Sequence, residues 1–317
     1  MKTMIYLITA LVCIIFTQFT ACFSLKSQMF HTETETRLVG PSMKTIKVSS
    51  RIECAMICSN DNCCSSSYDT LLAHCSLFRE CCPSKEFSKE SQTLTMLTEI
   101  SGLNPAPKDC SELPAESCSG VYVIQPENGP SMTVFCEMGI DNGGWTTVQR
   151  RYEGTVDFYR LWDDYKTGFG NIAGEHWLGN DNLHFILRQR SYQVRFDLED
   201  FAGVTAYAVY SRMYVGDESA NYKLNLTGYN GTAGNGMLNY RGLSGMMFST
   251  RDRDNDKGTK NCAVSRKGAW WYRACGAVNI NGVYQYSKEN SYSAVYWKPW
   301  RDMSGLKKTM MMIKPKP

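Results

Sequence analysis

The sequence contains only four histidines, and it lacks both the HExxH motif of zinc hydrolases and the GxSxG motif of serine hydrolases. It also lacks heptad repeats and Gly-X-Y repeats, so an oligomer would have to form without a coiled coil or a collagen stalk. The net charge of +3 is too small to indicate a protein that binds nucleic acid or an anionic membrane. We therefore expect neither an enzyme nor a nucleic-acid-binding protein.

Apolar segments long enough to cross a membrane are absent after the N-terminal region. Lys2 precedes an apolar run over residues 4–16, and small and polar residues follow at 20–24. About 15 apolar residues are too few to span a bilayer comfortably, and this order is typical of a signal peptide. We predict a signal peptide over residues 1–24, with a retained anchor as the alternative, and a secreted protein without membrane insertion.

Cysteine, in contrast, is abundant, with 14 residues, which favours an oxidising compartment. Cleavage after Ser24 would leave twelve cysteines, whereas cleavage before Cys22 would leave thirteen and one unpaired thiol. Seven cysteines fall within residues 30–100, which predicts a small domain stapled by disulfides: Cys54, Cys58, Cys63, Cys64, Cys75, Cys81 and Cys82. Zinc is the less favoured alternative, because CxxC spacing is missing. Ser50 and Glu53 form a capping box that predicts the start of a helix.

The spacing of Cys54, Cys58, Cys63, Cys64 and Cys75, with Tyr68 between them, resembles the PAN/apple module. The resemblance implies such a domain over residues 25–100, with Cys54 bonded to Cys75 and Cys58 bonded to Cys63 or Cys64. The adjacent cysteine pairs leave the connectivity open. Residues 101–108, which are rich in Gly, Asn and Pro, read as a linker.

Beyond Cys110 the composition changes, because Gly, Tyr and Trp become frequent and cysteines sparse. Alternating apolar patterns predict strands at 121–124, 132–135, 145–149 and 192–198. The turn signal at 141–144, Asp-Asn-Gly-Gly, separates two of them. Short helices are predicted at 162–165 and 180–189. The fold class is therefore α+β, with antiparallel or mixed sheets and long loops.

This part of the chain closely resembles the fibrinogen C-terminal domain, which implies that domain over residues 109–317. The resemblance is carried by ordered motifs: Val134-Phe-Cys-Glu-Met, Gly143-Gly-Trp-Thr-Thr-Val-Gln-Arg-Arg, Glu175-His-Trp-Leu-Gly-Asn-Asp, Asn261-Cys-Ala and Gly268-Ala-Trp-Trp-Tyr. It implies disulfides between Cys110 and Cys136 and between Cys262 and Cys275. Cys118 has no family partner, so we expect a bond to the N-terminal half, a bond to a second chain, or a buried free thiol.

Three alternating carboxylates, Asp252, Asp254 and Asp256, offer the hard oxygen ligands that calcium prefers. The spacing is not that of an EF-hand, and composition alone is equally compatible with a solvated acidic loop. The family resemblance implies a calcium site with side-chain ligands from Asp254 and Asp256 and carbonyl ligands from Gly258 and Lys260. Asp252 is expected to lie outside the coordination shell.

Related lectins, the ficolins and tachylectins, bind acetyl groups in an aromatic funnel next to their calcium site. The resemblance implies a corresponding pocket formed by Tyr292, Ser293, Tyr272, Ala274, Cys275, Gly276, Trp297 and Trp300, with the Ser293 carbonyl accepting the acetamido N–H. Three positions depart from the family pattern: Gly276 replaces a histidine, Ala274 replaces a larger polar residue, and Arg266 replaces a tyrosine. Trp270 and Trp271 are expected to belong to the core.

The resulting hypothesis is a secreted, calcium-binding, lectin-like protein of innate immunity that recognises acetylated or other glycans on microbial or cell surfaces. The alternative is an extracellular signalling or matrix ligand that binds a receptor protein. A disulfide-linked homo-oligomer is expected if multivalency is needed for avidity. Two sequons, at Asn225 and Asn230, predict N-glycosylation, with Asn230 favoured because Asn225 lies in a predicted strand.

Overall fold

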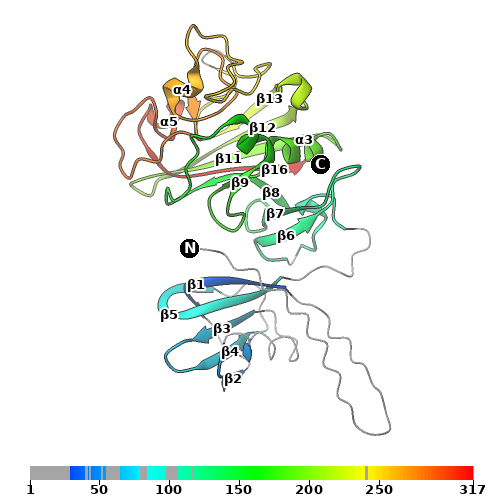
Figure 1. Ribbon diagram of the computed structural model, residues 1–317, viewed down its shortest axis with the longest axis vertical. Helices are drawn as coiled ribbons and strands as arrows, with labels where there is room; N and C mark the ends of the chain where they lie inside the picture. The colour runs from blue at the N-terminus through cyan, green and yellow to red at the C-terminus, as the bar shows by residue number, and fades with distance from the viewer. Residues whose placement is uncertain are drawn as a thin grey trace. The chain divides into compact units, whose positions relative to one another are not determined.

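The computed structural model describes residues 29–39, 42, 44–50, 53–54, 65–78, 84–97, 106–115, 117–239 and 242–316. The chain divides into two compact units, residues 1–106 with 116–122, and residues 107–115 with 123–317 (Figure 1). The predicted signal peptide and the predicted Cys58–Cys63 bond lie outside the described residues. No helix in the described part of the chain is long and apolar enough to cross a membrane.

The first unit contains an antiparallel sheet with strand order β1-β5-β3-β4-β2. Its strands are β1 (Met29–Val39), β2 (Lys44–Lys47), β3 (Ser65–Asp69), β4 (His74–Phe78) and β5 (Ser84–Leu97). Its described core is small, formed by Val48, Cys54, Cys75 and Leu77, and the Cys54–Cys75 disulfide joins two of these residues. Among the described residues, this bond therefore lies within the apolar cluster and fixes Cys54 to β4.

The helix start predicted at Ser50 is present in a slightly different form. The Ser50 hydroxyl accepts the Glu53 N–H at 3.2 Å, as in a capping box. The Glu53 carboxylate, however, accepts the N–H of Ser49 at 2.6 Å, one residue earlier than predicted.

The larger unit is organised around one antiparallel sheet of nine described strands. Seven follow the order β13-β12-β11-β16-β8-β10-β9, and β7 pairs with both β6 and β8. These strands are β6 (Gly120–Ile124), β7 (Met132–Glu137), β8 (Trp145–Arg151), β9 (Phe169–Gly170), β10 (His176–Trp177), β11 (Tyr192–Asp200), β12 (Thr205–Val215), β13 (Leu224–Gly231) and β16 (Leu306–Pro315). The sequence did not predict β16, which nevertheless lies between β11 and β8 (Figure 1).

Short helices and a small second sheet complete this unit. They are η1 (Cys110–Glu112), α2 (Trp162–Thr167), α3 (Asn180–Leu187), η2 (Glu218–Ala220), α4 (Cys262–Arg266), β14 (Val278–Asn279), β15 (Tyr296–Trp297) and α5 (Lys298–Arg301). The four strands and two helices predicted after residue 120 all correspond to elements of the structure. The α+β class is therefore confirmed for this unit.

The core of the larger unit is unusually aromatic. Trp177, Phe248, Trp270 and Trp271 are each fully buried, and the Trp270 and Trp271 rings meet edge to face at 4.9 Å between centroids. Phe248 packs against Trp271 at 5.1 Å. Burying several large rings contributes strongly to stability, so these tryptophans act as core, as expected.

The buried Glu175 side chain joins β8 to the loop that follows this strand. The Glu175 carboxylate accepts the backbone N–H groups of residues 152, 153, 154 and 156 at 2.8–3.1 Å. It also lies 3.7 Å from the Arg151 guanidinium, and both side chains are almost completely buried. The loop is thus held by one carboxylate that is itself neutralised inside the protein.

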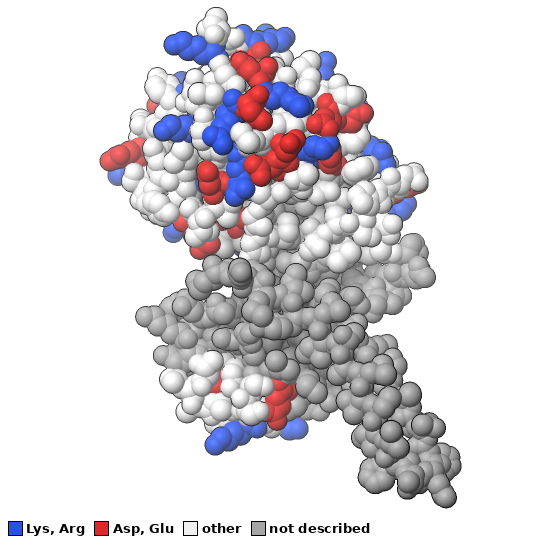
Figure 2. Space-filling model, in the orientation of Figure 1, with Lys and Arg blue, Asp and Glu red and all other residues white. Residues whose placement is uncertain are grey.

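The exposed surface carries charges of both signs. Figure 2 shows acidic and basic side chains interspersed over the visible face of the larger unit. A single-sign patch of the kind that binds polyanions is not seen on this face among the described residues, in keeping with the small net charge.

Candidate functional site

The acidic loop that follows Phe248 is anchored in the core. Ser249 and Trp270 exchange backbone hydrogen bonds of 2.9 and 3.2 Å, and both residues are fully buried. Asn261 caps α4, because its side-chain oxygen accepts the Val264 N–H at 3.1 Å while its amide donates to the Thr250 carbonyl at 3.1 Å. The segment between these anchors is thereby held as a defined loop.

Within this loop, Asp256 is fixed by the backbone. One carboxylate oxygen accepts the Gly258 N–H at 2.5 Å and the other accepts the Cys262 N–H at 2.7 Å. Asp254 lies next to it and accepts the Asp256 N–H at 3.2 Å. Burial raises the pKa of Asp256, the two N–H groups oppose that shift, and the nearby Asp254 carboxylate raises it further. The pair therefore has excess negative charge that a cation would relieve.

The donor set fits a hard cation. A Cβ atom on Gly258 would lie 2.8 Å from Asp256 Oδ1 and 3.1 Å from the Lys260 carbonyl oxygen, so both oxygens lie close to Gly258. No group of three or more His, Cys, Asp or Glu side chains in the described residues could hold a metal. A cation bound here would therefore depend on two carboxylates together with the carbonyls of Gly258 and Lys260, an all-oxygen set that suits calcium.

Asp252 has a structural role outside this donor set. Its carboxylate accepts the Trp162 N–H at 3.0 Å, at the start of α2, and the Thr250 hydroxyl at 2.7 Å. A carboxylate at the N-terminus of a helix is favourable because it satisfies a free N–H. The Asp252 side chain therefore connects the acidic loop to the start of α2.

A pocket of about 450 Å³ adjoins the loop. Its lining includes Lys260, Ser265, Arg266, Ala274, Cys275 and Tyr292. The Cys262–Cys275 disulfide is present, as the resemblance implied, and both of its cysteines line the pocket. The acidic loop and the disulfide therefore form parts of one recess, and two of its remaining side chains are basic.

Arg266 places a positive charge against the Tyr292 ring in this recess. Its guanidinium carbon lies 4.7 Å from the centroid of the Tyr292 ring, and its Nη1 donates to the Tyr292 carbonyl at 3.5 Å. Tyr292 is 62% exposed, so the arginine lies against one face of a ring that otherwise faces solvent. The sequence showed only that a tyrosine of the family pattern was missing, and not that its replacement would stack on a second tyrosine.

Two aromatic residues predicted to line the pocket are instead core residues. Tyr272 and Trp297 are fully buried, and their polar atoms donate to Asn279 Oδ1 at 2.6 Å and to the Gly234 carbonyl at 3.0 Å. A ring with no exposed surface and a satisfied polar atom belongs to the interior. The prediction that these rings contact ligand is therefore wrong.

Ser293 and Trp300 lie outside the pocket lining. The Ser293 carbonyl, expected to accept a ligand amide, accepts the Val283 N–H at 2.7 Å, which uses one of its two lone pairs. Trp300 is half-buried, is not part of the pocket lining, and has the Arg301 guanidinium 4.6 Å from its ring. Of the predicted ligand residues, only Ala274, Cys275 and Tyr292 line this pocket.

The backbone conformation at Gly276 disfavours the histidine of the family pattern. Its φ is +111°, a conformation that residues with a side chain rarely adopt. A Cβ atom there would also approach Leu243 Cδ2 to 3.1 Å. A histidine at this position would require a different backbone, so its absence is built into the local structure.

The remaining predicted covalent sites are placed as follows. Cys110 is bonded to Cys136, and Cys118 is disulfide-bonded within this single chain, which excludes the free thiol. Asn225 and Asn230 are both exposed and both lie in β13, the strand at one edge of the sheet. Strand position therefore does not favour Asn230 over Asn225 as a glycan acceptor.

Residues 106–316 match the family described as the C-terminal globular domain of fibrinogen beta and gamma chains. Fibrinogen C domain-containing protein 1-B of Xenopus laevis is 43% identical over 219 residues, which is 66% of this chain and 47% of that protein. The chain thus spans about half the length of this relative.

Two solved structures resemble the larger unit. The fibrinogen-like globe domain of human ANGPTL2 is 40% identical with a TM-score of 0.64, covering 67% of this chain and all of that one. Lamprey fibrin D-dimer, complexed with the peptide Gly-His-Arg-Pro-amide, is 33% identical with a TM-score of 0.63, covering 66% of this chain and 74% of that one. With the family match over about two thirds of its length, the chain belongs to the fibrinogen C-terminal globular domain family.

Proposed function

We propose that this chain is an extracellular recognition protein whose larger unit binds a partner protein through the pocket beside the Cys262–Cys275 disulfide. Several disulfides favour an oxidising, extracellular location. Lamprey fibrin was solved with a peptide ligand, which shows that a relative of this fold can bind a peptide. This supports the signalling or matrix ligand over the lectin.

The observation that carries the proposal is the stacking of Arg266 on Tyr292. The acetyl-binding funnel of the lectins has neutral aromatic walls, whereas here a guanidinium stacks on one face of the Tyr292 ring and places a cation in the recess. Arg266 and Lys260 instead present two cations beside the recess, where they could bind carboxylate or carbonyl groups of a protein. The buried Tyr272 and Trp297 remove two more walls of the acetyl-binding funnel.

The test is binding of the labelled full chain to cultured cells. We expect binding to be lost after trypsin treatment of the cells and to be unaffected by free N-acetylglucosamine. Arg266→Gln should weaken binding by about tenfold or more, the loss typical of an interfacial arginine.

Arg212→Gln is the matched control, since Arg212 is an exposed arginine of β12 that does not line the pocket. Complete inhibition by N-acetylglucosamine, together with resistance to trypsin, would restore the lectin hypothesis. In that case Arg266→Ala, which removes the guanidinium from the Tyr292 ring, should strengthen the binding of the acetylated sugar.

We also propose that the acidic loop binds calcium through Asp254, Asp256 and the carbonyls of Gly258 and Lys260. The fixed Asp256 carboxylate and its close neighbour Asp254 support this. The ion would stabilise the loop that forms one side of the pocket, and the pocket residues would contact the partner.

Removal of calcium should therefore lower stability. A ligand at one hundred times its Kd adds about 2.7 kcal/mol to the free energy of unfolding. We expect calcium to raise the melting temperature and chelation to return it to its original value. Asp256→Asn should abolish this rise. Asp252→Asn should lower the melting temperature at every calcium concentration but keep the rise with calcium. The reason is that the Asp252 carboxylate accepts the Trp162 N–H at the start of α2 and is not one of the proposed ligands. An equal calcium response in Asp256→Asn would refute the site.

For the N-terminal unit we propose an adhesive, PAN/apple-like module. The Cys54–Cys75 bond and the antiparallel sheet support this assignment. The exposed Asn225 and Asn230 are proposed as glycan acceptors of the larger unit.

A further inference from the structure

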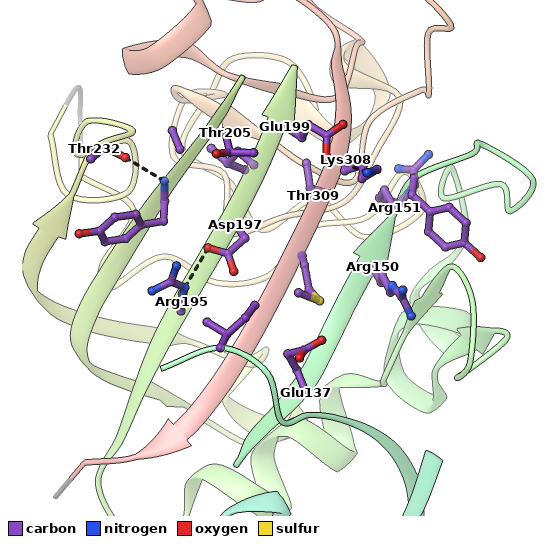
Figure 3. Close-up of a pocket in the computed structure, with 16 residues that line it drawn as sticks. Glu137, Arg150, Arg151, Arg195, Asp197, Glu199, Thr205, Thr232, Lys308 and Thr309 are labelled. Carbon is purple, nitrogen blue, oxygen red and sulfur yellow. Dashed lines mark hydrogen bonds and ion pairs between the residues drawn. The ribbon is translucent and has the colours of Figure 1, made fainter. Parts of the chain in front are cut away.

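A second recess lies on the sheet itself, away from the pocket described above. It is an open groove of about 700 Å³ lined by residues of β7, β8, β11, β12 and β16 (Figure 3). Burial alternates along β11, so that one face of the strand packs into the core and the other faces this groove. None of the residues of the pocket beside the disulfide lines the groove.

The strand register places three groove residues in one row. Asp197 of β11 pairs with Met310 of β16, and Met310 pairs with Arg150 of β8. Figure 3 shows Asp197 and Arg150 on either side of β16. Adjacent strands are about 4.8 Å apart, so the backbones of Asp197 and Arg150 are roughly 10 Å apart, with an apolar methionine between them.

The charges in the groove are not equally neutralised. Arg195 donates to Asp197 at 2.8 Å and to Asp141 at 2.5 Å, and Lys308 pairs with Glu199 at 2.7 Å. The remaining acid, Glu137, accepts the Gly139 N–H at 2.8 Å. Arg150, in contrast, forms no ion pair with any carboxylate of the described residues.

Arg150 is nevertheless held in place. Its guanidinium carbon lies 4.8 Å from the Phe135 ring and 5.2 Å from the Tyr152 ring, and Nη1 donates to the Ala173 carbonyl at 3.3 Å. A planar guanidinium positioned by two rings keeps most of its donors for another group and loses little freedom when it binds. A carboxylate, which accepts two parallel N–H bonds, is its natural partner.

The composition of the groove distinguishes among classes of ligand. The Phe135, Tyr152 and Tyr207 rings each lie against a guanidinium, so one face of each ring is already occupied and a cation lies beside it. The acids Asp197, Glu199 and Glu137 lie between the basic side chains, so the groove lacks the continuous row of cations that a polyanion needs. Arginine, aromatic residues and methionine together are typical of surfaces that bind protein.

We propose that this groove binds an extended segment of a partner protein in which one carboxylate side chain is flanked by apolar side chains. The carboxylate pairs with Arg150, and an apolar neighbour covers Met310. The groove crosses from β12 to β8, a width of roughly 15 Å, which an extended segment of about five residues would span.

The test is a selection of random heptapeptides displayed on phage against the full chain, with counter-selection against its Arg150→Gln variant. We expect the retained peptides to carry Asp or Glu beside apolar residues. Their synthetic forms should bind Arg150→Gln about tenfold or more weakly than the unmodified chain. Arg150→Lys, which keeps the charge without the planar fork, should recover part of the affinity.

Arg188→Gln is the matched control, because Arg188 also stacks on a ring, that of Phe185 at 4.7 Å, outside the groove. Arg266→Gln should likewise leave these peptides bound, which separates this site from the pocket of the proposed function. The proposal is overturned if no peptide distinguishes the unmodified chain from Arg150→Gln, or if the retained peptides are basic. Heparin binding that is lost in Arg150→Gln would also overturn it, in favour of a polyanion site.

Discussion

Glu175→Ala is expected to lower the free energy of unfolding of the larger unit by about 3–5 kcal/mol, the cost of breaking a buried ion pair by removing one partner. Glu175 and Arg151 have almost no exposed surface, so the change would leave a buried guanidinium without its counter-charge. It would also leave the backbone N–H groups of residues 152, 153, 154 and 156 without their acceptor.

The pKa of Glu175 shows which contacts stabilise its charged form. Burial raises the pKa of its carboxyl, but hydrogen bonds from the backbone N–H groups and the charge of Arg151 outweigh this, so that the pKa falls below its usual value. The carboxylate is therefore more stable in the folded protein than in water, despite its burial.

Urea unfolding followed by tryptophan fluorescence would measure the effect, with Glu153→Ala as the control. Glu153 belongs to the same loop but is exposed, and its replacement should cost less than about 0.5 kcal/mol. Glu175→Gln, which keeps an acceptor but loses the charge, should lie between the two. Equal unfolding midpoints for Glu175→Ala and Glu153→Ala would show that the buried pair does not stabilise the fold.

Acidification is expected to destabilise the larger unit through His176, the next residue along the chain. His176 is fully buried, and burial lowers its pKa to about 4, although the Gly174 and Thr147 carbonyls oppose that shift. The folded state therefore holds neutral imidazole at a pH where the unfolded state, with a pKa of about 6.5, binds a proton. Stability due to this residue is complete above about pH 6.5 and is lost as the pH falls toward 4.

The difference between the folded and unfolded pKa of His176 corresponds to about 3 kcal/mol, of which about 2 kcal/mol is lost between pH 7 and pH 5. Urea unfolding at pH 7, 6 and 5 would measure this loss. His176→Gln should be less stable at pH 7 but should show a flatter dependence on pH in this window. A slope unchanged by the substitution would assign the acid sensitivity to other groups.

The fold of the larger unit was predictable wherever short-range patterns determine structure. Alternation over residues 192–198 predicts β11, and the Asp141-Asn-Gly-Gly turn separates β7 from β8. The strand β16 was missed because its centre, Thr-Met-Met-Met-Ile, neither alternates nor is rich in β-branched residues. Its strand conformation comes from pairing with β8 and β11, which are far away in sequence.

The candidate site was predictable in location but not in chemistry. Lys260, Cys275 and Tyr292 do line one pocket, whereas the family resemblance could not show which aromatic rings are buried. Arg266 and Arg150 illustrate the same limit. In sequence Arg150 looks like an ordinary surface arginine and Arg266 only like a departure from the family pattern. The role of each depends on a ring supplied by another segment of the chain.

The central position of β16 has a consequence for synthesis. A ribosome delivers residues 306–315 after all the other strands of the sheet, yet these residues join β11 to β8. Until then the nascent chain holds two half-sheets, each with an unpaired edge that invites association with other chains. Chaperones that shield exposed strand edges should therefore be needed until the last strand emerges, and a premature stop before Leu306 should yield aggregate rather than a slightly shorter protein.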